Sequence, residues 1–379
     1  MRIGVVAYEM EGRPTGVGRY LEGLLKGVAG LGHTADEWLL FFKGKPFEHP
    51  LWESLAGGPT VQPVFDNRPH WRPILWEQLR LPKVLRQANL DLLFSPGYSL
   101  PKGVDVPMVV TLHDLSFEHL GDEFSFKERW RRRFLARRAA QQATRVLADT
   151  QTIASDLATT YGLPPEKIGI VPLGIAQRFR SRRGITPADD AARLGVVGVR
   201  PPYLLALGTI MPRRRTDLVI RAFREIAEQY PKLTLVLGGS NRLRHPRDLD
   251  RWIRDSGVAE RIVRLDWVPE ESLAALYRRS ELSIYLSTYE GYGLPPLEAL
   301  ALGTPVLVSP RLALDDLWPG YPLLCPRLDA ETVASSLRQA LADPEALRQV
   351  GHEGRQRLSG LGWEQSSALF LGELRKAMS

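Results

Sequence analysis

The sequence of 379 residues contains one cysteine, Cys325, and this scarcity excludes a disulfide framework within the chain. Its apolar neighbours Leu323 and Leu324 indicate a buried thiol and not a nucleophile. Long apolar runs are lacking as well, since none approaches the roughly 20 residues that a membrane-spanning helix needs. The strand-like start, Met1–Tyr8, is too short for the apolar core of a secretory signal, so we expect a cytoplasmic protein.

The rest of the composition is that of an ordinary globular protein. Hydrophobic residues make up 44% and charged residues 25%, which excludes a disordered chain and leaves core for about two to three domains. The formal charge is +7, and arginine is strongly preferred over lysine. This excess favours partners that carry phosphate, such as nucleic acid, anionic lipid headgroups or a nucleotide diphosphate.

The basic charge is concentrated in residues 127–138, KERWRRRFLARR. Trp130 and Phe134 lie four residues apart in this segment, which places them on one face of a helix among many cations. Two interpretations stay open. Either the aromatic rings pack on the domain and leave the arginines in water, or the segment contacts an anionic membrane.

Short apolar runs alternate with helical patterns along the chain, which predicts α/β architecture with parallel sheets. The expected strands are Ile3–Tyr8, Leu39–Phe42, Asp91–Ser95, Met108–Leu112, Val146–Asp149, Tyr203–Leu207, Leu233–Leu237, Ile262–Leu265, Leu282–Leu286 and Val306–Ser309. A polar, proline-punctuated stretch separates the two groups, so we expect doubly wound domains over residues 1–180 and 202–362, with a linker over 181–201. Ligands of such sheets bind outside the carboxyl ends of the strands, here in the cleft between the halves.

Two glutamates eight residues apart, Glu290 and Glu298, flank a turn that opens a helix. The glycines of Gly291–Gly293 allow close approach of a ligand, and Pro295 and Pro296 suit the first helical turn. Amides and the positive end of the helix dipole favour a diphosphate, while the two carboxylates can accept hydroxyl groups of a sugar and a ribose. Taken alone, the spacing is more typical of a helix cap followed by a solvated helix residue.

The strand Tyr203–Leu207 leads into a loop with three successive arginines, Arg213–Arg215, before the expected helix Leu218–Tyr230. A loop that follows a strand of a parallel sheet lies at the ligand-binding edge, so its cations are directed toward an anion. Arginine binds phosphate through two parallel hydrogen bonds. The alternative is a run of solvated arginines.

Two further segments follow strands in the first half of the chain. Thr15–Tyr20 carries Gly16 at the start of the expected helix Tyr20–Val28, where bare amides suit an anion, although a tight turn explains the glycines equally. His113 follows a strand at the edge that holds functional groups, and Asp114 is expected to orient the histidine or its loop. A single histidine is usually structural, and His113 lacks partners at the spacing of a metal site.

In this order, the glycine loop, the His-Asp pair, the Pro-Arg-Arg loop and the paired glutamates resemble the retaining GT-B glycosyltransferases that use nucleotide sugars, of the group 1 and family 4-like kind. The resemblance covers most of the chain. It implies a GT-B fold of two Rossmann-like domains facing across a cleft, with a C-terminal helix in residues 363–379 crossing back to the first domain. The implication is an analogy at the level of the fold.

The resemblance also implies roles for individual residues. Arg213 and Arg214 grip the leaving diphosphate, although the family commonly has lysine at the position of Arg214. Glu290 holds sugar hydroxyls, Glu298 holds the ribose, and His113 lies near the donor sugar or the reacting oxygens. Further donor contacts are implied for Gly16, Thr209, Val268, Tyr292, Gly293 and Leu294.

Asp248 and Asp250 match the D-x-D metal motif of other glycosyltransferases, but they lie in an arginine-rich helical stretch. We therefore interpret them as a solvated helix face. Arginines and helix amides suffice to neutralise a diphosphate, so we expect no metal and no cofactor besides the donor substrate.

The expected function is metal-independent, retaining transfer of a hexosyl group, by resemblance mannosyl or rhamnosyl, from a nucleotide diphosphate sugar. The expected acceptor is a glycan or a lipid-linked molecule in cell-envelope or exopolysaccharide synthesis. The enzyme would act in the cytoplasm, or peripherally at the inner face of the membrane, without nucleic acid. The alternatives are a nucleic-acid-binding protein, which explains the charge alone, and a non-catalytic, epimerase or phosphorylase member of the GT-B fold.

Overall fold

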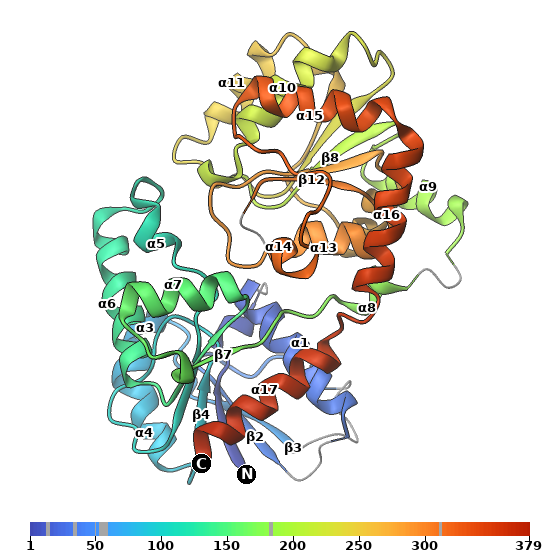
Figure 1. The fold of residues 1–379 in the computed structure, drawn as a ribbon. Helices are drawn as coiled ribbons and strands as arrows, with labels where there is room; N and C mark the ends of the chain where they lie inside the picture. Colours follow the sequence, from blue (N-terminus) through green and yellow to red (C-terminus); the bar gives the residue numbers. More distant parts are fainter. Residues whose placement is uncertain (13–15, 33–35, 50, 53–59, 182–184, 311–312) are drawn as a thin grey trace. The chain divides into compact units, whose positions relative to one another are not determined.

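A computed structural model describes residues 1–379 except 13–15, 33–35, 50, 53–59, 182–184 and 311–312 (Figure 1). Thr15 of the glycine loop and Arg311 and Leu312 therefore lie outside the described residues. The chain divides into two compact units, residues 1–174 with 361–379, and residues 175–360. Within the described residues, no helix combines the length and the apolar character needed to cross a bilayer.

A parallel sheet forms the centre of the first unit, and its strand order within the described residues is β3-β2-β1-β4-β5-β6-β7. The chain fills one side of the sheet from β1 outward and then returns to the other side through β4, so the order reverses between β1 and β4. The strands are β1 (Arg2–Val6), β2 (Glu37–Phe42), β3 (Thr60–Phe65), β4 (Leu92–Ser95), β5 (Met108–Thr111), β6 (Arg145–Ala148) and β7 (Ile168–Ile170).

Most of the described helices of this unit follow the strands as crossover connections, and the C-terminal helix joins them from the end of the chain. The described helices are η1 (Tyr8–Met10), α1 (Gly16–Gly30), α3 (Pro73–Leu75), η2 (Trp76–Arg80), α4 (Leu81–Arg86), α5 (Ser116–His119), η3 (Gly121–Glu123), α6 (Phe126–Gln142), α7 (Gln151–Tyr161), η4 (Pro165–Lys167) and α17 (Trp363–Met378). Thr150 caps α7 and Gly162 ends it in the left-handed conformation, so both ends of that helix are set by local chemistry.

The C-terminal helix α17 packs against α1 in the first unit, as the resemblance implied (Figure 1). Close approach requires glycine on α1, because a Cβ atom on Gly23 would lie 2.2 Å from the ring of Trp363, and one on Gly27 would lie 2.2 Å from Ser367 Oγ. Ser367 Oγ donates a hydrogen bond of 2.9 Å to the carbonyl of Leu24. Phe370 of α17 is buried in the core of this unit.

The second unit is built on a parallel sheet of order β10-β9-β8-β11-β12 among the described residues. The strands are β8 (Tyr203–Leu207), β9 (Thr234–Gly238), β10 (Ile262–Leu265), β11 (Leu282–Tyr285) and β12 (Val306–Val308). The helices are α8 (Gln177–Arg180), α9 (Pro187–Val196), η5 (Pro212–Arg214), α10 (Thr216–Ala227), α11 (Arg247–Asp255), η6 (Ala259–Arg261), α12 (Glu270–Arg279), α13 (Leu294–Ala301), α14 (Ala313–Leu317), α15 (Ala330–Ala342) and α16 (Pro344–Leu358).

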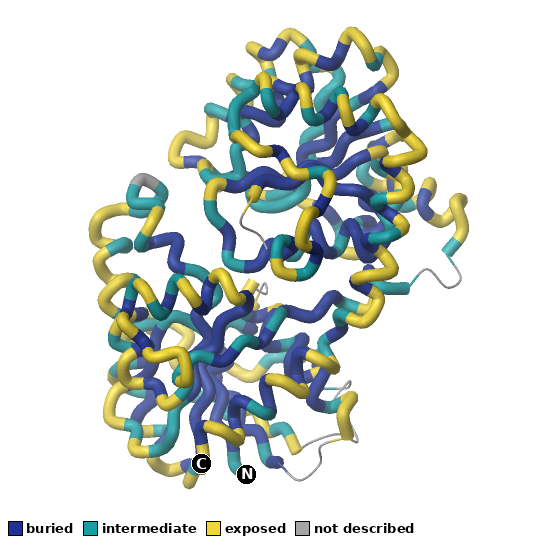
Figure 2. The backbone as a smooth tube through the Cα atoms, viewed as in Figure 1, coloured by how far each residue is buried: buried dark blue, intermediate teal, exposed yellow. Residues whose placement is uncertain are grey.

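The central strands of both sheets are buried, while the outer faces of the helices are exposed (Figure 2). The predicted α/β class and the two doubly wound domains are therefore confirmed. Two strands were not predicted from the sequence, β3 and β7, which form the two edges of the first sheet. Residues 181–201, expected as a linker, contain the helix α9, which packs against α12 in the second unit.

Candidate functional site

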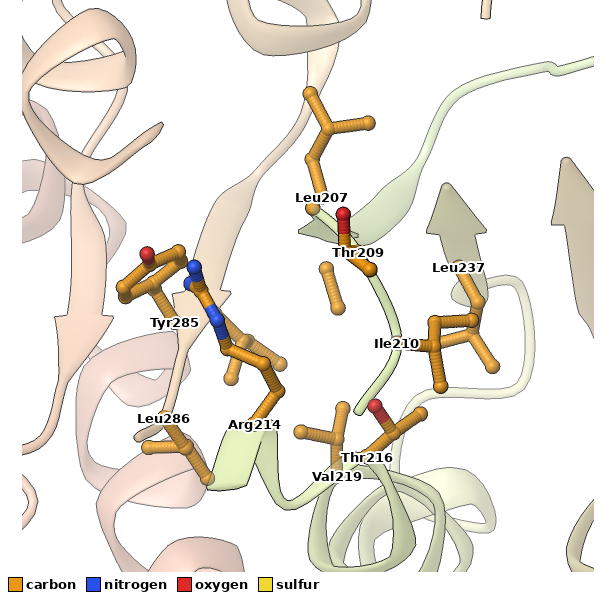
Figure 3. A pocket seen from close by; sticks show the side chains of 12 residues that line it. Leu207, Thr209, Ile210, Arg214, Thr216, Val219, Leu237, Tyr285 and Leu286 are labelled. Atoms are coloured by element: carbon orange, nitrogen blue, oxygen red, sulfur yellow. The ribbon is translucent and has the colours of Figure 1, made fainter. Parts of the chain in front are cut away.

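The order of the second sheet changes direction between β8 and β11, and the carboxyl ends of these strands line a cavity of about 30 Å³. Figure 3 shows Thr209, Arg214 and Tyr285 at this cavity. Parallel α/β sheets bind ligands at such a change of direction, just beyond the carboxyl ends of the strands. Thr209 and Arg214, both expected at the donor site, therefore lie at the edge where a ligand is expected.

Backbone geometry shapes the loop after β8. Gly208 and Gly239 adopt φ of 137° and 135°, which side chains rarely allow, and a Cβ atom on Gly239 would lie 2.1 Å from the carbonyl oxygen of Gly208. The two loops that follow β8 and β9 can thus approach each other closely. Pro212 opens the short helix η5, and Arg215 ends it in the left-handed conformation with φ of 47°.

The three arginines of this loop have different surroundings. Arg213 Nε lies 3.3 Å from Glu290 Oε1, and Arg214 Nη2 lies 3.2 Å from Glu290 Oε2. Arg215 pairs with Asp217, at 2.9 Å between Nη2 and Oδ2. The structure therefore brings the first two arginines to one carboxylate and holds the third on its own helix.

The Glu290 carboxylate is nearly buried, with 9% of the residue exposed. Besides its ion pairs with the two arginines, the carboxylate accepts hydrogen bonds from two hydroxyl groups. The Tyr285 hydroxyl donates to Oε2 at 3.1 Å, and Ser287 Oγ donates to Oε1 at 3.1 Å. The Arg214 guanidinium carbon lies 4.1 Å from the centroid of the Tyr285 ring, so the ring covers one face of the cation. The carboxylate thus fixes the positions of both guanidinium groups before any ligand is present.

The helix α13 begins after Gly293, which has φ of 81°, and continues through Leu294 and the two prolines. Because Pro295 and Pro296 carry no N–H, Gly293 and Leu294 supply the N–H groups that have no acceptor within the helix. The peptide dipoles of the rest of the helix still direct their positive end toward this terminus. The array of free amides is consequently smaller than predicted from the sequence, and the arginines carry more of the positive charge.

Glu298 lies on α13 and is half-buried. The hydroxyl of Tyr277, a buried residue of α12, donates to Glu298 Oε2 at 3.4 Å. Burial, reinforced by the Glu298 carboxylate, raises the pKa of Tyr277 well above its ordinary value, so the hydroxyl stays protonated as a donor. Tyr292 and Val268, the other expected donor contacts, are both buried.

The first unit places His113 just beyond β5, at the carboxyl edge of its sheet. His113 Nδ1 lies 2.8 Å from Asp149 Oδ2, and Nε2 lies 3.1 Å from the carbonyl oxygen of Pro96. Asp114 does not pair with the ring. Its carboxylate accepts from the Ser116 amide at 3.0 Å and orients the loop, so of the two roles expected for Asp114 the structure shows the second.

The charge state of His113 follows from these contacts. Burial by itself lowers its pKa, but the charge and the hydrogen bond of Asp149, together with Asp114 and the Pro96 carbonyl, outweigh that effect. The pKa of His113 is therefore raised above its ordinary value. The Tyr20 ring packs edge-on against the His113 ring at a centroid distance of 4.6 Å. The Tyr20 hydroxyl shares a 3.0 Å hydrogen bond with Thr111 Oγ1.

Gly16 is the first residue of α1 and is exposed, and a Cβ atom there would meet nothing within 4 Å. The neighbouring Gly18 is different, because its Cβ would lie 2.4 Å from the carbonyl oxygen of Glu9. Gly18 therefore has a packing requirement. At Gly16 the described protein imposes none, which leaves space for a ligand at the N-terminus of the helix.

Two interpretations outside the site are confirmed. Asp248 and Asp250 lie on the helix α11 and pair with arginines, Asp248 with Arg251 at 3.0 Å and Asp250 with Arg264 at 2.5 Å. Cys325 is buried, and its burial raises the pKa of the thiol.

Several side chains in these sites were not identified from the sequence: Asp149, Tyr277, Tyr285 and Ser287. A signal existed for Asp149, because it directly follows the buried strand β6 at the same sheet edge as His113. The two tyrosines had no such signal. In sequence, each reads as an apolar core position of a helix or a strand.

Comparison with known proteins supports the fold. The family model described as "Glycosyltransferase Family 4" matches residues 14–178, and that described as "Glycosyl transferases group 1" matches residues 196–357. A D-inositol 3-phosphate glycosyltransferase of Kribbella flavida is 30% identical over 288 residues, which is 72% of this chain and 66% of the relative. The match thus spans just under two thirds of that relative.

Two mannosyltransferases align over nearly their whole length. The MMP alpha-(1->4)-mannosyltransferase of Mycolicibacterium hassiacum is 24% identical, covering 100% of this chain and 99% of the relative. The O-antigen chain mannosyltransferase B of Escherichia coli is 27% identical, with 92% and 93% covered.

Solved structures share the fold at low identity. The sucrose-phosphate synthase from Thermosynechococcus elongatus superposes with a TM-score of 0.77 at 20% identity, covering 99% of this chain and 98% of that one. Anabaena Alr3699/HepE, solved with UDP and glucose, has a TM-score of 0.75 at 19% identity, covering 99% and 100%. With two parallel-sheet units and matches to both family models, the chain belongs to the GT-B glycosyltransferases.

Proposed function

We propose that the protein is a retaining, metal-independent glycosyltransferase that takes a hexosyl group from a nucleotide diphosphate sugar. The observation that carries the proposal is the cluster of Arg213, Arg214 and Glu290 at the carboxyl ends of β8 and β11. Two guanidinium groups fixed at a ligand-binding sheet edge suit a diphosphate, whose charge rises as the bond to the sugar breaks.

Each site residue has a distinct part in this proposal. Arg213 and Arg214 bind the diphosphate, and the N-terminus of α13 adds the field of its dipole. The Glu290 carboxylate, positioned by Tyr285 and Ser287, holds hydroxyl groups of the sugar. Glu298, fixed by Tyr277, accepts from the ribose.

In the transfer step, the acceptor hydroxyl oxygen forms a bond to the anomeric carbon while the bond to the diphosphate oxygen breaks. The electron pair of that bond leaves with the diphosphate, and a phosphate oxygen takes the acceptor proton on the same face of the sugar. No general base from the protein is assigned. In the first unit, we assign Gly16 to the donor phosphate or the acceptor, and His113 to the donor sugar or the reacting oxygens.

The names of full-length relatives support a choice of substrate class. Two of them are mannosyltransferases, one of the O-antigen chain. We accordingly infer transfer of a mannosyl or related hexosyl group to a glycan or lipid-linked acceptor of the cell envelope. UDP and glucose bound to a structural neighbour support a nucleotide-linked donor. We also propose peripheral contact with the inner face of an anionic membrane.

The proposal is tested by melting the purified protein against UDP, GDP, dTDP and ADP. We expect one nucleotide to raise the melting temperature by mass action, and the sugar donors of that nucleotide to support turnover. Turnover should persist in EDTA, and NMR of the product should show the anomeric configuration of the donor. Asp248→Asn is the control, since a metal-binding D-x-D would lose activity and the solvated pair would not. A protein that melts identically with all four nucleotides would contradict the donor site.

A further inference from the structure

The helix α6 exposes a row of aromatic side chains on the first unit. Phe126, Trp130 and Phe134, spaced four residues apart, are 85%, 62% and 52% exposed. The expectation that these rings pack on the domain is therefore wrong. The rings of Trp130 and Phe134 stack on each other instead, with centroids 5.7 Å apart and planes 6° apart.

The opposite face of α6 explains why the aromatic row points to solvent. Ala136, Ala139 and Ala140 are buried, and α6 packs with this small-residue face against α5, α7 and β5. Small side chains bring the helix close to the unit and leave no room for large rings beneath it. Exposed apolar groups of this size, arranged along one helix face, are typical of an interaction surface and not of a solvated helix.

Cations flank the aromatic row on both sides. At about 100° per residue along the helix, Lys127 and Arg131 lie on one side of the row and Arg133 and Arg137 on the other, and all four are exposed. Two acidic side chains near α6 form ion pairs with arginines of the helix, Glu128 with Arg132 and Glu118 with Arg133. Among the described residues, no ion pair with an acidic side chain involves Lys127 or Arg131.

A second exposed apolar row lies on the element joined to α6. Gln78 of η2 accepts a 2.7 Å hydrogen bond from Arg138 of α6. On the segment that contains Gln78, Trp71, Leu75 and Leu79 are exposed and again spaced four residues apart. Both elements of the first unit thus present large apolar side chains.

We propose that α6 docks on an anionic lipid bilayer, with its aromatic row in the interfacial region and its flanking cations on the headgroups. Aromatic side chains favour that region, and a planar surface is met by a straight row of residues at helical spacing. Each lysine or arginine near an anionic surface adds attraction that salt screens. A nucleic acid duplex would contact the cations but offers no apolar region for the exposed aromatic row, so a bilayer fits the surface better.

The docking surface has a consequence for the acceptor. The strand β5, against which α6 packs, ends two residues before His113, so docking would bring this unit to the membrane at which lipid-linked acceptors reside. The proposed docking of α6 does not depend on the donor site, so vesicle binding can be measured without glycosyl transfer.

The test is flotation of the purified full chain with vesicles of phosphatidylcholine, with and without phosphatidylglycerol. We expect binding only to the anionic vesicles, weakened by salt. The double variant with Trp130→Ala and Phe134→Ala should lower the partition coefficient for anionic vesicles at least roughly tenfold. The pair Lys127→Gln and Arg131→Gln should lower it about fivefold per cation.

The matched control is the outer face of α17, which is exposed on the same unit. Leu369→Ala and Arg375→Gln replace exposed residues of the same two kinds and should leave vesicle binding unchanged. Unchanged melting shifts with nucleotide in the α6 variants would show that they are folded and that the donor site is separate. Absence of wild-type binding to anionic vesicles, or equal binding by the α6 variants, would overturn the proposal. So would an RNA gel shift or self-association that depends on Trp130 while vesicle binding does not.

Discussion

Arg214 Nη2 lies 3.2 Å from Glu290 Oε2, and the two side chains come from loops that follow adjacent strands of one sheet. The pair is mostly buried, with 17% of the arginine and 7% of the glutamate side chain exposed. A carboxylate that holds two arginines also competes with a diphosphate for them. The donor site as proposed therefore balances positioning of the cations against neutralisation of their charge.

This balance predicts an unusual outcome for Glu290→Gln. The variant keeps the size of the side chain but frees Arg213 and Arg214 from the opposing charge, so affinity for the free nucleotide diphosphate should rise or stay constant. Turnover should fall by about a hundredfold or more, because the sugar loses a charged acceptor. Calorimetry of nucleotide binding and a turnover assay measure the two effects. A parallel loss of both would contradict a role at the sugar.

Removing the whole side chain adds a cost in stability. Glu290→Ala leaves two guanidinium groups without their shared carboxylate, so we expect the free energy of unfolding to fall by about 3 kcal/mol. Urea unfolding of the variant and of Glu290→Gln gives the comparison. Equal stability of the alanine variant and the wild type would show that the ion pairs contribute nothing.

Tyr277→Phe should weaken ribose binding without unfolding the protein. The change removes the hydroxyl that donates to Glu298 and keeps the buried ring. We expect about fivefold weaker donor binding, the value of one hydrogen bond of roughly 1 kcal/mol. The matched control is Tyr203→Phe, whose buried hydroxyl bonds the Leu276 carbonyl away from Glu298. If both variants bind the donor equally well, Tyr277 does not position Glu298.

Asp149→Asn should lower the pKa of His113, because the carboxylate is the main group that raises it. A raised pKa means that the protonated histidine stabilises the folded protein below the unfolded value of about 6.5 and that this contribution is lost as pH rises through the folded pKa. The variant should thus lose more stability at acidic than at alkaline pH. NMR of labelled histidine follows the titration directly. An unchanged His113 midpoint would contradict the assignment of Asp149 as its partner.

Gly23→Ala and Gly27→Ala should each detach α17 from α1. The added methyl would overlap Trp363 or Ser367, so we expect a loss of about 1–3 kcal/mol in the stability of the first unit. Gly30→Ala is the control, since its Cβ would meet Glu364 Cγ at an ordinary 3.7 Å. Hydrogen exchange of α17 would report the local loosening. Equal protection in all three variants would argue against tight docking.

Ten strands were predicted from short apolar runs, because a parallel strand that is buried on both faces consists almost entirely of apolar residues. The two missed strands are the edges of the first sheet. β3 is largely exposed and contains Pro63, and β7 is three residues long with Gly169 at its centre. Strands like these carry little periodic signal, because an edge strand buries less and tolerates proline.

The charged groups of the candidate site were predictable, but their partners were not. A loop after a strand of a parallel sheet lies at the ligand-binding edge. The order of strands and loops in the sequence therefore sufficed to place Arg213, Arg214 and His113 at such edges. Tertiary packing then chooses between neighbours, as when Asp149 pairs with His113 and the adjacent Asp114 does not. The same holds for Trp130, whose exposure depends on the buried alanines about two to three turns further along α6.

The most direct test of the account is calorimetric titration of the nucleotide diphosphate identified by melting into the wild type, Arg214→Gln and Arg215→Gln. Arg214 reaches the cavity at the strand ends, whereas Arg215 is held by Asp217. We expect Arg214→Gln to weaken binding by about ten- to a hundredfold, the value of hydrogen bonds to a charged group, and Arg215→Gln to change it by less than about threefold. Wild-type affinity in Arg214→Gln, or an equal loss in both variants, would contradict a diphosphate site built on Arg214.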